Sequence, residues 1–203
     1  DDFVKFKLGR PMTAKPGEAW EYSNSGYALI AAMIEKVSGV TFEEFCADQV
    51  FKPAGMKSAT MIGCANLDLA RVPKIDRGRG FTDMPKDFAF AYGNKLSWGY
   101  RGCGGIVASV HDMHAWDRAL RDAKFLSKAS IDDFYKPGLK DYALGWTMTK
   151  AAGGTRAEHS GGVQGVVTYY MRHLEEDWVI ALACSYQPKS HPAQIAERLA
   201  KLL

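Results

Sequence analysis

The chain of 203 residues is predicted to adopt an α+β fold, in which helices come first and an antiparallel sheet follows. Apolar residues recur at helical spacing in several stretches of the first two thirds of the chain, whereas after Pro137-Gly138 they alternate with a period of two. A last helical pattern begins at Pro192 and closes the chain. Helices and strands that are segregated along a chain are typical of the α+β class.

A turn at Pro16-Gly17 leads into the first long apolar run. Short polar side chains before this run can cap a helix that begins at about Asn24. The run from Ser25 to Ser38 is apolar nearly all round, which predicts a buried helix, and Gly39 is suited to end it. Tyr22 is therefore expected at the mouth of a buried helix. Polar residues at a helix start often serve as caps alone, so this stretch does not by itself indicate catalysis.

Thr41 and Glu44 have the spacing of a capping box, which predicts a second helix that Pro53 ends. Residues 57–100 show no sustained period and are rich in glycine and charged residues. A loop of this length is commonly functional or disordered. Two interpretations stay open for it: a segment that borders a substrate cleft and sets specificity, or a surface excursion.

Ser109 and Asp112 can cap a third helix that runs to about Asp122, and a short helix fits residues 128–135. The inward side chains of the third helix are expected to be Val110, Met113, Trp116 and Leu120.

Three strands are predicted after this helical part, over residues 142–148, 166–172 and 178–184. The last of them is almost wholly apolar, which favours a central strand that is buried on both faces. The segment 158–162, Glu-His-Ser-Gly-Gly, follows a strand-like stretch and leads into the second predicted strand.

Composition excludes several classes of protein. With 47% hydrophobic and 24% charged residues the chain can bury a core, and its net charge of +3 is too small to indicate a nucleic acid or an anionic membrane as partner. No run approaches the roughly 20 apolar residues of a membrane span. The four cysteines lack metal-ligand spacing, and His111 and His114 have no third ligand nearby, so neither a metal nor another cofactor is predicted.

Five short motifs follow one another along the chain: Tyr22-Ser23-Asn24, Phe51 to Met56, Gly104 to Ser109, Tyr142-Ala143-Leu144-Gly145-Trp146 and His159-Ser160-Gly161. Their order resembles the penicillin-recognising serine hydrolases, which comprise the β-lactamase, DD-peptidase and related esterase families. The first motif is similar to the Tyr-x-Asn element of the class C branch. The last is similar to its Lys-Thr-Gly element, with histidine in place of lysine.

The resemblance implies a β-lactamase/transpeptidase-like fold, an antiparallel sheet flanked by helices. It also implies that residues 1–203 are the C-terminal portion of a single such domain, without its N-terminal strands and nucleophile helix. Within it we expect a Tyr-x-Asn helical part, a cleft-bordering region, further helices, and the strands with the last helix; these parts span residues 1–56, 57–103, 104–136 and 137–203. No serine of the chain is followed by lysine three residues on, so the Ser-x-x-Lys nucleophile motif is missing.

The resemblance also implies the roles of the site residues. Tyr22 is expected to act as the base for a serine nucleophile. Since free tyrosine has a pKa of about 10, this role needs cationic neighbours. His159 takes the place of one such neighbour, but its reference pKa of about 6.5 leaves it mostly neutral at pH 7, so we expect activity to depend on its protonation.

Substrate binding is expected from Asn24, Ser160 and Gly161, and the backbone N–H of Gly162 is expected to form half of an oxyanion hole. The implied reaction is hydrolysis of a small-molecule ester or amide through an acyl-enzyme, with β-lactams and D-amino acid peptides as further candidates. The serine is expected from an N-terminal segment or companion chain, so this chain alone should be unstable and inactive. An inactive binding or regulatory module is the alternative. The resemblance alone favours a periplasmic or secreted protein.

Overall fold

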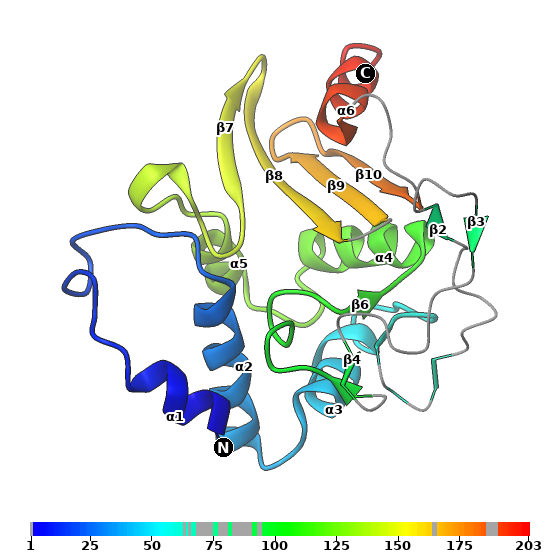
Figure 1. Cartoon of the computed structure of the whole chain (residues 1–203). Helices are drawn as coiled ribbons and strands as arrows, with labels where there is room; N and C mark the ends of the chain where they lie inside the picture. Colours follow the sequence, from blue (N-terminus) through cyan, green and yellow to red (C-terminus); the bar gives the residue numbers. More distant parts are fainter. Residues whose placement is uncertain are drawn as a thin grey trace.

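A four-stranded antiparallel sheet with helices on both faces forms the C-terminal half of the protein (Figure 1). The computed structural model describes residues 2–62, 64, 66–67, 75–76, 81–82, 91–92, 95–163, 166–185 and 191–203. The strands are β7 (Thr147–Ala151), β8 (Gly154–Val163), β9 (Val166–His173) and β10 (Trp178–Cys184), in the spatial order β10-β9-β8-β7. The predicted α+β class is confirmed.

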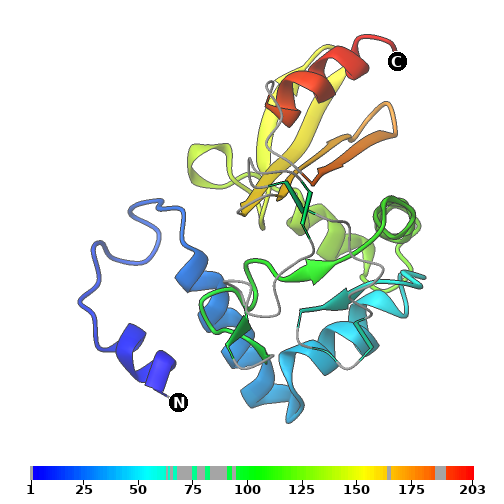
Figure 2. The ribbon, with the colours of Figure 1, turned by 45° about the vertical axis from the view of Figure 1, so that its right-hand side comes forward.

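Alternation along β9 directs its side chains to two separate cores. Tyr169 and Met171 pack with Ile180 against α6 (Pro192–Ala200) on one face. Tyr170 lies on the other face, where α4 (Val110–Arg121) and α5 (Lys128–Phe134) cover the sheet. Figures 1 and 2 show α6 on one side of the sheet and α4 on the other.

A helical layer lies on the α4 side of the sheet (Figure 2). It contains α2 (Asn24–Ser38), α3 (Phe42–Cys46), a π-helix (Ala47–Phe51) and the strand pair β1 (Thr60–Met61) and β6 (Ile106–Val107). The remaining elements are α1 (Asp2–Leu8), the 3₁₀-helix η3 (Leu139–Asp141) and the two-residue strands β2 (Ile75–Asp76), β3 (Phe81–Thr82), β4 (Ala91–Tyr92) and β5 (Lys95–Leu96). A core built around Phe51, Met61 and Ala119 joins this layer to α4.

The predicted helix caps are present. The Ser23 hydroxyl accepts a hydrogen bond from the Gly26 N–H at 3.0 Å, so α2 begins at Asn24. Both reciprocal bonds of a capping box form at the start of α3 and again at the start of α4. Gly39 ends α2 with a φ of 77°, a left-handed conformation that glycine adopts without strain.

The prediction that the first apolar helix is buried all round is wrong. Only Ala28 and Ala31 of α2 are buried, whereas Ile30, Met33 and Val37 are 50%, 65% and 87% exposed. These three side chains lie on one face of the helix, because they are separated by three and four residues. Apolar residues on all sides of a helix do not show which other elements of the chain will cover it.

The strand prediction is wrong in three places. The strand over residues 178–184, β10, was expected in the centre of the sheet, but it lies at one edge of the described sheet and pairs with β9. The sheet has four strands instead of three, because residues 154–163 form β8, which pairs with β7 on one side and β9 on the other. The segment Tyr142–Trp146 is a turn instead of a strand: the Ala143 N–H donates to the Trp146 carbonyl at 2.8 Å, and Gly145 has a φ of 88°. Pairing with β7 over residues 154–158 and with β9 over residues 156–163, and not the alternation of β8 itself, holds this segment extended.

One helix was not predicted, and one helix prediction needs correction. Residues 2–8 form α1 and contact α2. In α4, Val110 is 54% exposed, whereas Leu120 is buried as expected. Val110 is the first residue of α4 and lies beyond the edge of the surface that the helix covers.

A close approach of two backbones positions the start of α2. A Cβ added at Gly102 would lie 2.3 Å from the carbonyl oxygen of Tyr27, and the φ of Gly102 is 79°. Next to it, Arg101 forms ion pairs with Glu43 at 2.7 Å and Glu35 at 3.8 Å. The turn that precedes β6 is thereby bound to α2 and α3. These contacts fix the position of α2, and with it the position of the residues just before the helix.

Asp112 is a buried carboxylate that should make stability depend on pH. Burial alone would raise the pKa of Asp112, but hydrogen bonds from Ser58 and Ser109 outweigh burial and lower the pKa from 3.8 to about 2. Because the folded-state pKa is depressed, this stabilisation is present above the unfolded pKa and is lost as the pH falls towards 2. It amounts to roughly 1 kcal/mol between pH 6 and pH 3 and roughly 2 kcal/mol in total.

We expect Asp112→Asn to remove this part of the pH dependence. Urea unfolding of the wild type and the variant at pH 6 and pH 3 measures it. Equal losses of stability in the two proteins would contradict the assignment.

Most of the segment 57–100 lies outside the described residues, so both interpretations of it stay open. All four cysteines, at positions 46, 64, 103 and 184, are free thiols. Among the described residues, no helix is both long and apolar enough to cross a membrane.

Candidate active site

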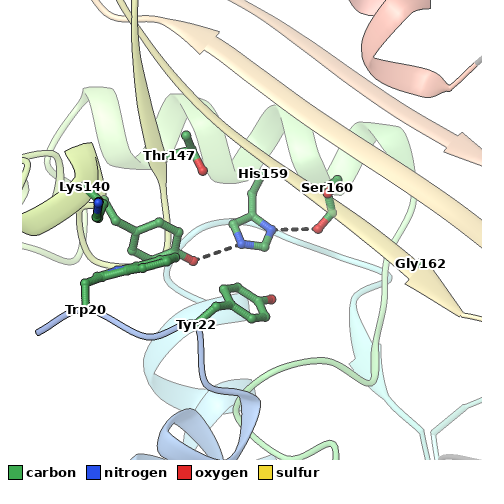
Figure 3. A pocket seen from close by; sticks show the side chains of 8 residues that line it. Trp20, Tyr22, Lys140, Thr147, His159, Ser160 and Gly162 are labelled. Carbon is green, nitrogen blue, oxygen red and sulfur yellow. Dashed lines mark hydrogen bonds between the residues drawn. The ribbon is translucent and has the colours of Figure 1, made fainter. Parts of the chain in front are cut away.

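A pocket of about 620 Å³ opens between the sheet and the residues that precede α2 (Figure 3). Three separate parts of the chain line it: the lead into α2, the turn before β7, and the second half of β8. The lining residues are Trp20, Tyr22, Lys140, Tyr142, Thr147, His159, Ser160 and Gly162.

The pairing of β8 explains why its second half borders the pocket. His159 pairs with Tyr170 of β9, so its side chain lies on the face of the sheet that looks towards the helical layer. The ladder with β7 ends at Glu158, and residues 159–163 have no partner on that side among the described strands. The backbone of this segment therefore forms a free strand edge at the pocket.

His159 is held by two hydrogen bonds in the plane of its ring (Figure 3). Its Nε2 lies 3.0 Å from the hydroxyl of Tyr142, and its Nδ1 lies 2.7 Å from the carbonyl oxygen of Ser160. Both ring nitrogens are thus occupied, and only the faces of the imidazole remain open to other groups.

Tyr22 occupies one of these faces. Its ring centroid lies 6.0 Å from that of His159 at an interplanar angle of 27°, and the side chain is 52% exposed. Because Tyr22 immediately precedes the N-cap residue Ser23, its backbone is fixed by the start of α2. The start of α2 fixes the backbone of Tyr22, and His159 packs against its ring. The exposed half of the Tyr22 side chain borders the pocket.

Two further aromatic side chains, Trp20 and Tyr142, line the pocket together with Tyr22. Tyr142 packs against Trp20 with centroids 5.2 Å apart and meets the ring of Tyr22 edge-on at 6.3 Å. Burial, with a smaller contribution from Tyr27 and Tyr22, raises the pKa of Tyr142 to about 12. Tyr142 therefore keeps its proton at neutral pH and can serve as a hydrogen-bond donor.

The structure brings most of the predicted site residues together. Tyr22, His159, Ser160 and Gly162 all line the pocket, whereas Asn24 and Gly161 do not. Asn24 is exposed at the first turn of α2. A Cβ at position 161 would lie 2.4 Å from the Thr168 hydroxyl oxygen, so the glycine of this motif also permits close pairing with β9.

Four lining residues, Trp20, Lys140, Tyr142 and Thr147, were not predicted as site residues from the sequence. Gly145 was the available indication for Tyr142, since a glycine inside an apparent strand often marks a bend. Lys140 and the following Asp141 both have left-handed backbones, with φ of 59° and 53°. Strain of this kind is found preferentially at functional sites, but it cannot be read from side-chain periodicity.

The chain is similar to known proteins over its whole length. The family model described as Beta-lactamase matches residues 1–203. A penicillin-binding protein of Bacillus subtilis strain 168 is 30% identical over 175 residues, which cover 79% of this chain and 38% of the relative. A D-aminopeptidase of Brucella anthropi is 29% identical over 157 residues, which cover 74% of this chain and 28% of the relative.

Among solved structures, a penicillin-binding protein from Bacillus halodurans superposes with a TM-score of 0.77 and 20% identity. The match covers 100% of this chain and 61% of that protein. This likeness confirms the predicted fold. The chain spans less than two fifths of the length of the two relatives and less than two thirds of that structure.

Proposed function

We propose that this chain, which belongs to the beta-lactamase family, forms part of a serine hydrolase that cleaves ester or amide bonds through an acyl-enzyme. Proteins of this family are serine hydrolases of amide and ester bonds. One observation carries the proposal for this chain: Tyr22 lies against the face of His159 in a pocket that the free edge of β8 borders.

In this proposal Tyr22 acts as its phenolate, and the phenolate oxygen is the general base that accepts the proton of a serine as the serine attacks the carbonyl carbon. The same group then returns the proton to the leaving alcohol or amine. The Gly162 N–H is one donor to the oxyanion, and Ser160 and Gly161 hold the substrate along the edge of β8. Asn24, two residues after Tyr22 at the start of α2, binds the substrate amide or ester oxygen.

The serine in this proposal belongs to a Ser-x-x-Lys motif outside these 203 residues. Two observations support that arrangement. The chain contains no serine with lysine three residues on, and α2 exposes Ile30, Met33 and Val37 on one face. A helix that carries the nucleophile could cover this apolar face.

His159 favours simple esters and small amides over β-lactams as substrates. A lysine in the same motif would present a permanent positive charge to a substrate carboxylate, whereas His159 has both ring nitrogens engaged by Tyr142 and Ser160. A catalytically inactive binding module is the alternative, and the missing nucleophile motif is the observation that favours it.

Covalent labelling tests the proposal. We expect the full-length protein to gain the mass of a fluorophosphonate adduct on one serine outside residues 1–203, and to hydrolyse aryl esters. Ser160→Ala removes the pocket serine of this chain; it should still gain the adduct, although more slowly, because Ser160 helps to hold the substrate. An adduct on Ser160 would contradict the proposal, because it would identify Ser160 of this chain as the nucleophile. Absence of both labelling and hydrolysis would identify the binding module.

A further inference from the structure

The turn before β7 holds Tyr142 in place from two sides. The Gly138 N–H donates to the Tyr142 carbonyl at 2.9 Å, and Tyr142 forms an isolated bridge with Thr147. Its ring is covered by Trp20, at a centroid distance of 5.2 Å. The Tyr142 hydroxyl therefore approaches His159 from a fixed direction.

The two hydrogen bonds of His159 are compatible with one arrangement of protons on the neutral ring. The carbonyl oxygen of Ser160 can only accept, so the Nδ1 that lies 2.7 Å from it carries the proton. Nε2 is then unprotonated and accepts the hydrogen bond from the Tyr142 hydroxyl at 3.0 Å. The chain of donors runs from Tyr142 through His159 to the backbone of β8.

We propose that Tyr142 is a positioning residue that keeps His159 in the Nδ1-protonated form, with the plane of its ring fixed between Tyr142 and the Ser160 carbonyl. This inference deepens the proposed function, since it assigns a role in the same site to a residue outside the two motifs that carry Tyr22 and His159.

The arrangement has two consequences for the pocket. The imidazole face is directed at Tyr22, with an interplanar angle of 27°, and cannot turn without losing both of its hydrogen bonds. The Ser160 carbonyl accepts a hydrogen bond from the His159 ring. This bond fixes the backbone of β8 along its free edge, where the proposed substrate would bind. The raised pKa of Tyr142 agrees with a hydroxyl that remains a donor.

NMR of the full-length protein labelled with ¹⁵N-histidine tests the inference without any substrate. The resonances of His159 are assigned by their absence in His159→Asn. We expect a protonated Nδ1 and an unprotonated Nε2 in the wild type at a pH where His159 is neutral. In Tyr142→Phe the two nitrogen shifts should move towards each other as both tautomers become populated. An Nε2-protonated wild type, or a Tyr142→Phe spectrum identical to the wild type, would overturn the proposal.

Tyr135→Phe is the matched control, because the Tyr135 hydroxyl is buried without a hydrogen-bond partner in the described part of the chain. It should leave the His159 resonances unchanged. In turnover, Tyr142→Phe should lower kcat roughly tenfold, as expected for one lost neutral hydrogen bond, and leave KM within about twofold. An unchanged kcat would overturn the positioning role.

The two sets of data separate the two proposals. A protein with the expected tautomer but no hydrolytic activity would retain the positioning by Tyr142 and contradict the proposed function. An active protein in which neutral His159 carries its proton on Nε2 would support the proposed function and contradict the positioning by Tyr142.

Discussion

Replacement of Tyr22 by phenylalanine is expected to lower kcat/KM of the full-length protein for aryl esters by about 100-fold or more, the usual contribution of a general base. Phenylalanine keeps the ring that packs against His159 at 6.0 Å and fills the same volume. It removes only the oxygen that would accept the proton from the serine. Because Tyr22 is half exposed and lies outside the helix, the variant should retain the stability of the wild type.

Tyr135→Phe again serves as the comparison, since it also deletes one tyrosine hydroxyl but lies in the core beneath the sheet, beside Trp146. Steady-state hydrolysis and thermal unfolding of both variants give the result. If Tyr22→Phe keeps more than half of the wild-type kcat/KM, Tyr22 is not the base, and another group in the pocket must accept the proton.

Arg172→Met is expected to cost about 3–5 kcal/mol of stability, because it leaves a buried carboxylate without its cation. Asp117 and Arg172 are 2% and 5% exposed, and Arg172 donates to Asp117 between β9 and α4. Tyr170 also donates to Asp117, at 2.9 Å. This loss is a large share of the roughly 5–15 kcal/mol that stabilises an ordinary domain.

Two further variants show whether the cost arises from the unpaired charge. Arg121→Met removes an exposed arginine from the same cluster, at Asp177, and should cost less than about 1 kcal/mol. The double variant Asp117→Leu with Arg172→Met removes both charges and should recover much of the loss. Denaturant unfolding of the three proteins measures these differences. A double variant as unstable as Arg172→Met would mean that packing, and not charge, dominates.

The buried pair also connects stability with the site. Tyr170, which bonds to Asp117, is the residue of β9 that pairs with His159. The cluster thereby holds β9, and with it the strand that carries His159, against α4. None of these links was visible in the sequence, because Asp117 and Arg172 are 55 residues apart and each is ordinary in its own helix or strand.

The sequence predicted correctly those helix caps and helix ends that depend on residues only a few positions apart. Ser23, Thr41 and Ser109 each cap a helix through bonds to residues three positions away. Gly39 and Pro192 mark a helix end and a helix start for similar reasons. The motifs that contain Tyr22 and His159 could be recognised in order along the chain, and the pocket brings those two side chains together.

The sequence by itself thus determined the α+β class, the caps of α2, α3 and α4, and the two residues at the centre of the pocket. The tertiary structure alone decided that α2 leaves one apolar face exposed, that residues 154–163 form a central strand, and that Tyr142 turns back towards His159. These outcomes depend on which distant segments meet. Burial of a helix face, pairing of a glycine-rich strand and the direction of a side chain after a left-handed turn are set by partners that periodicity cannot identify.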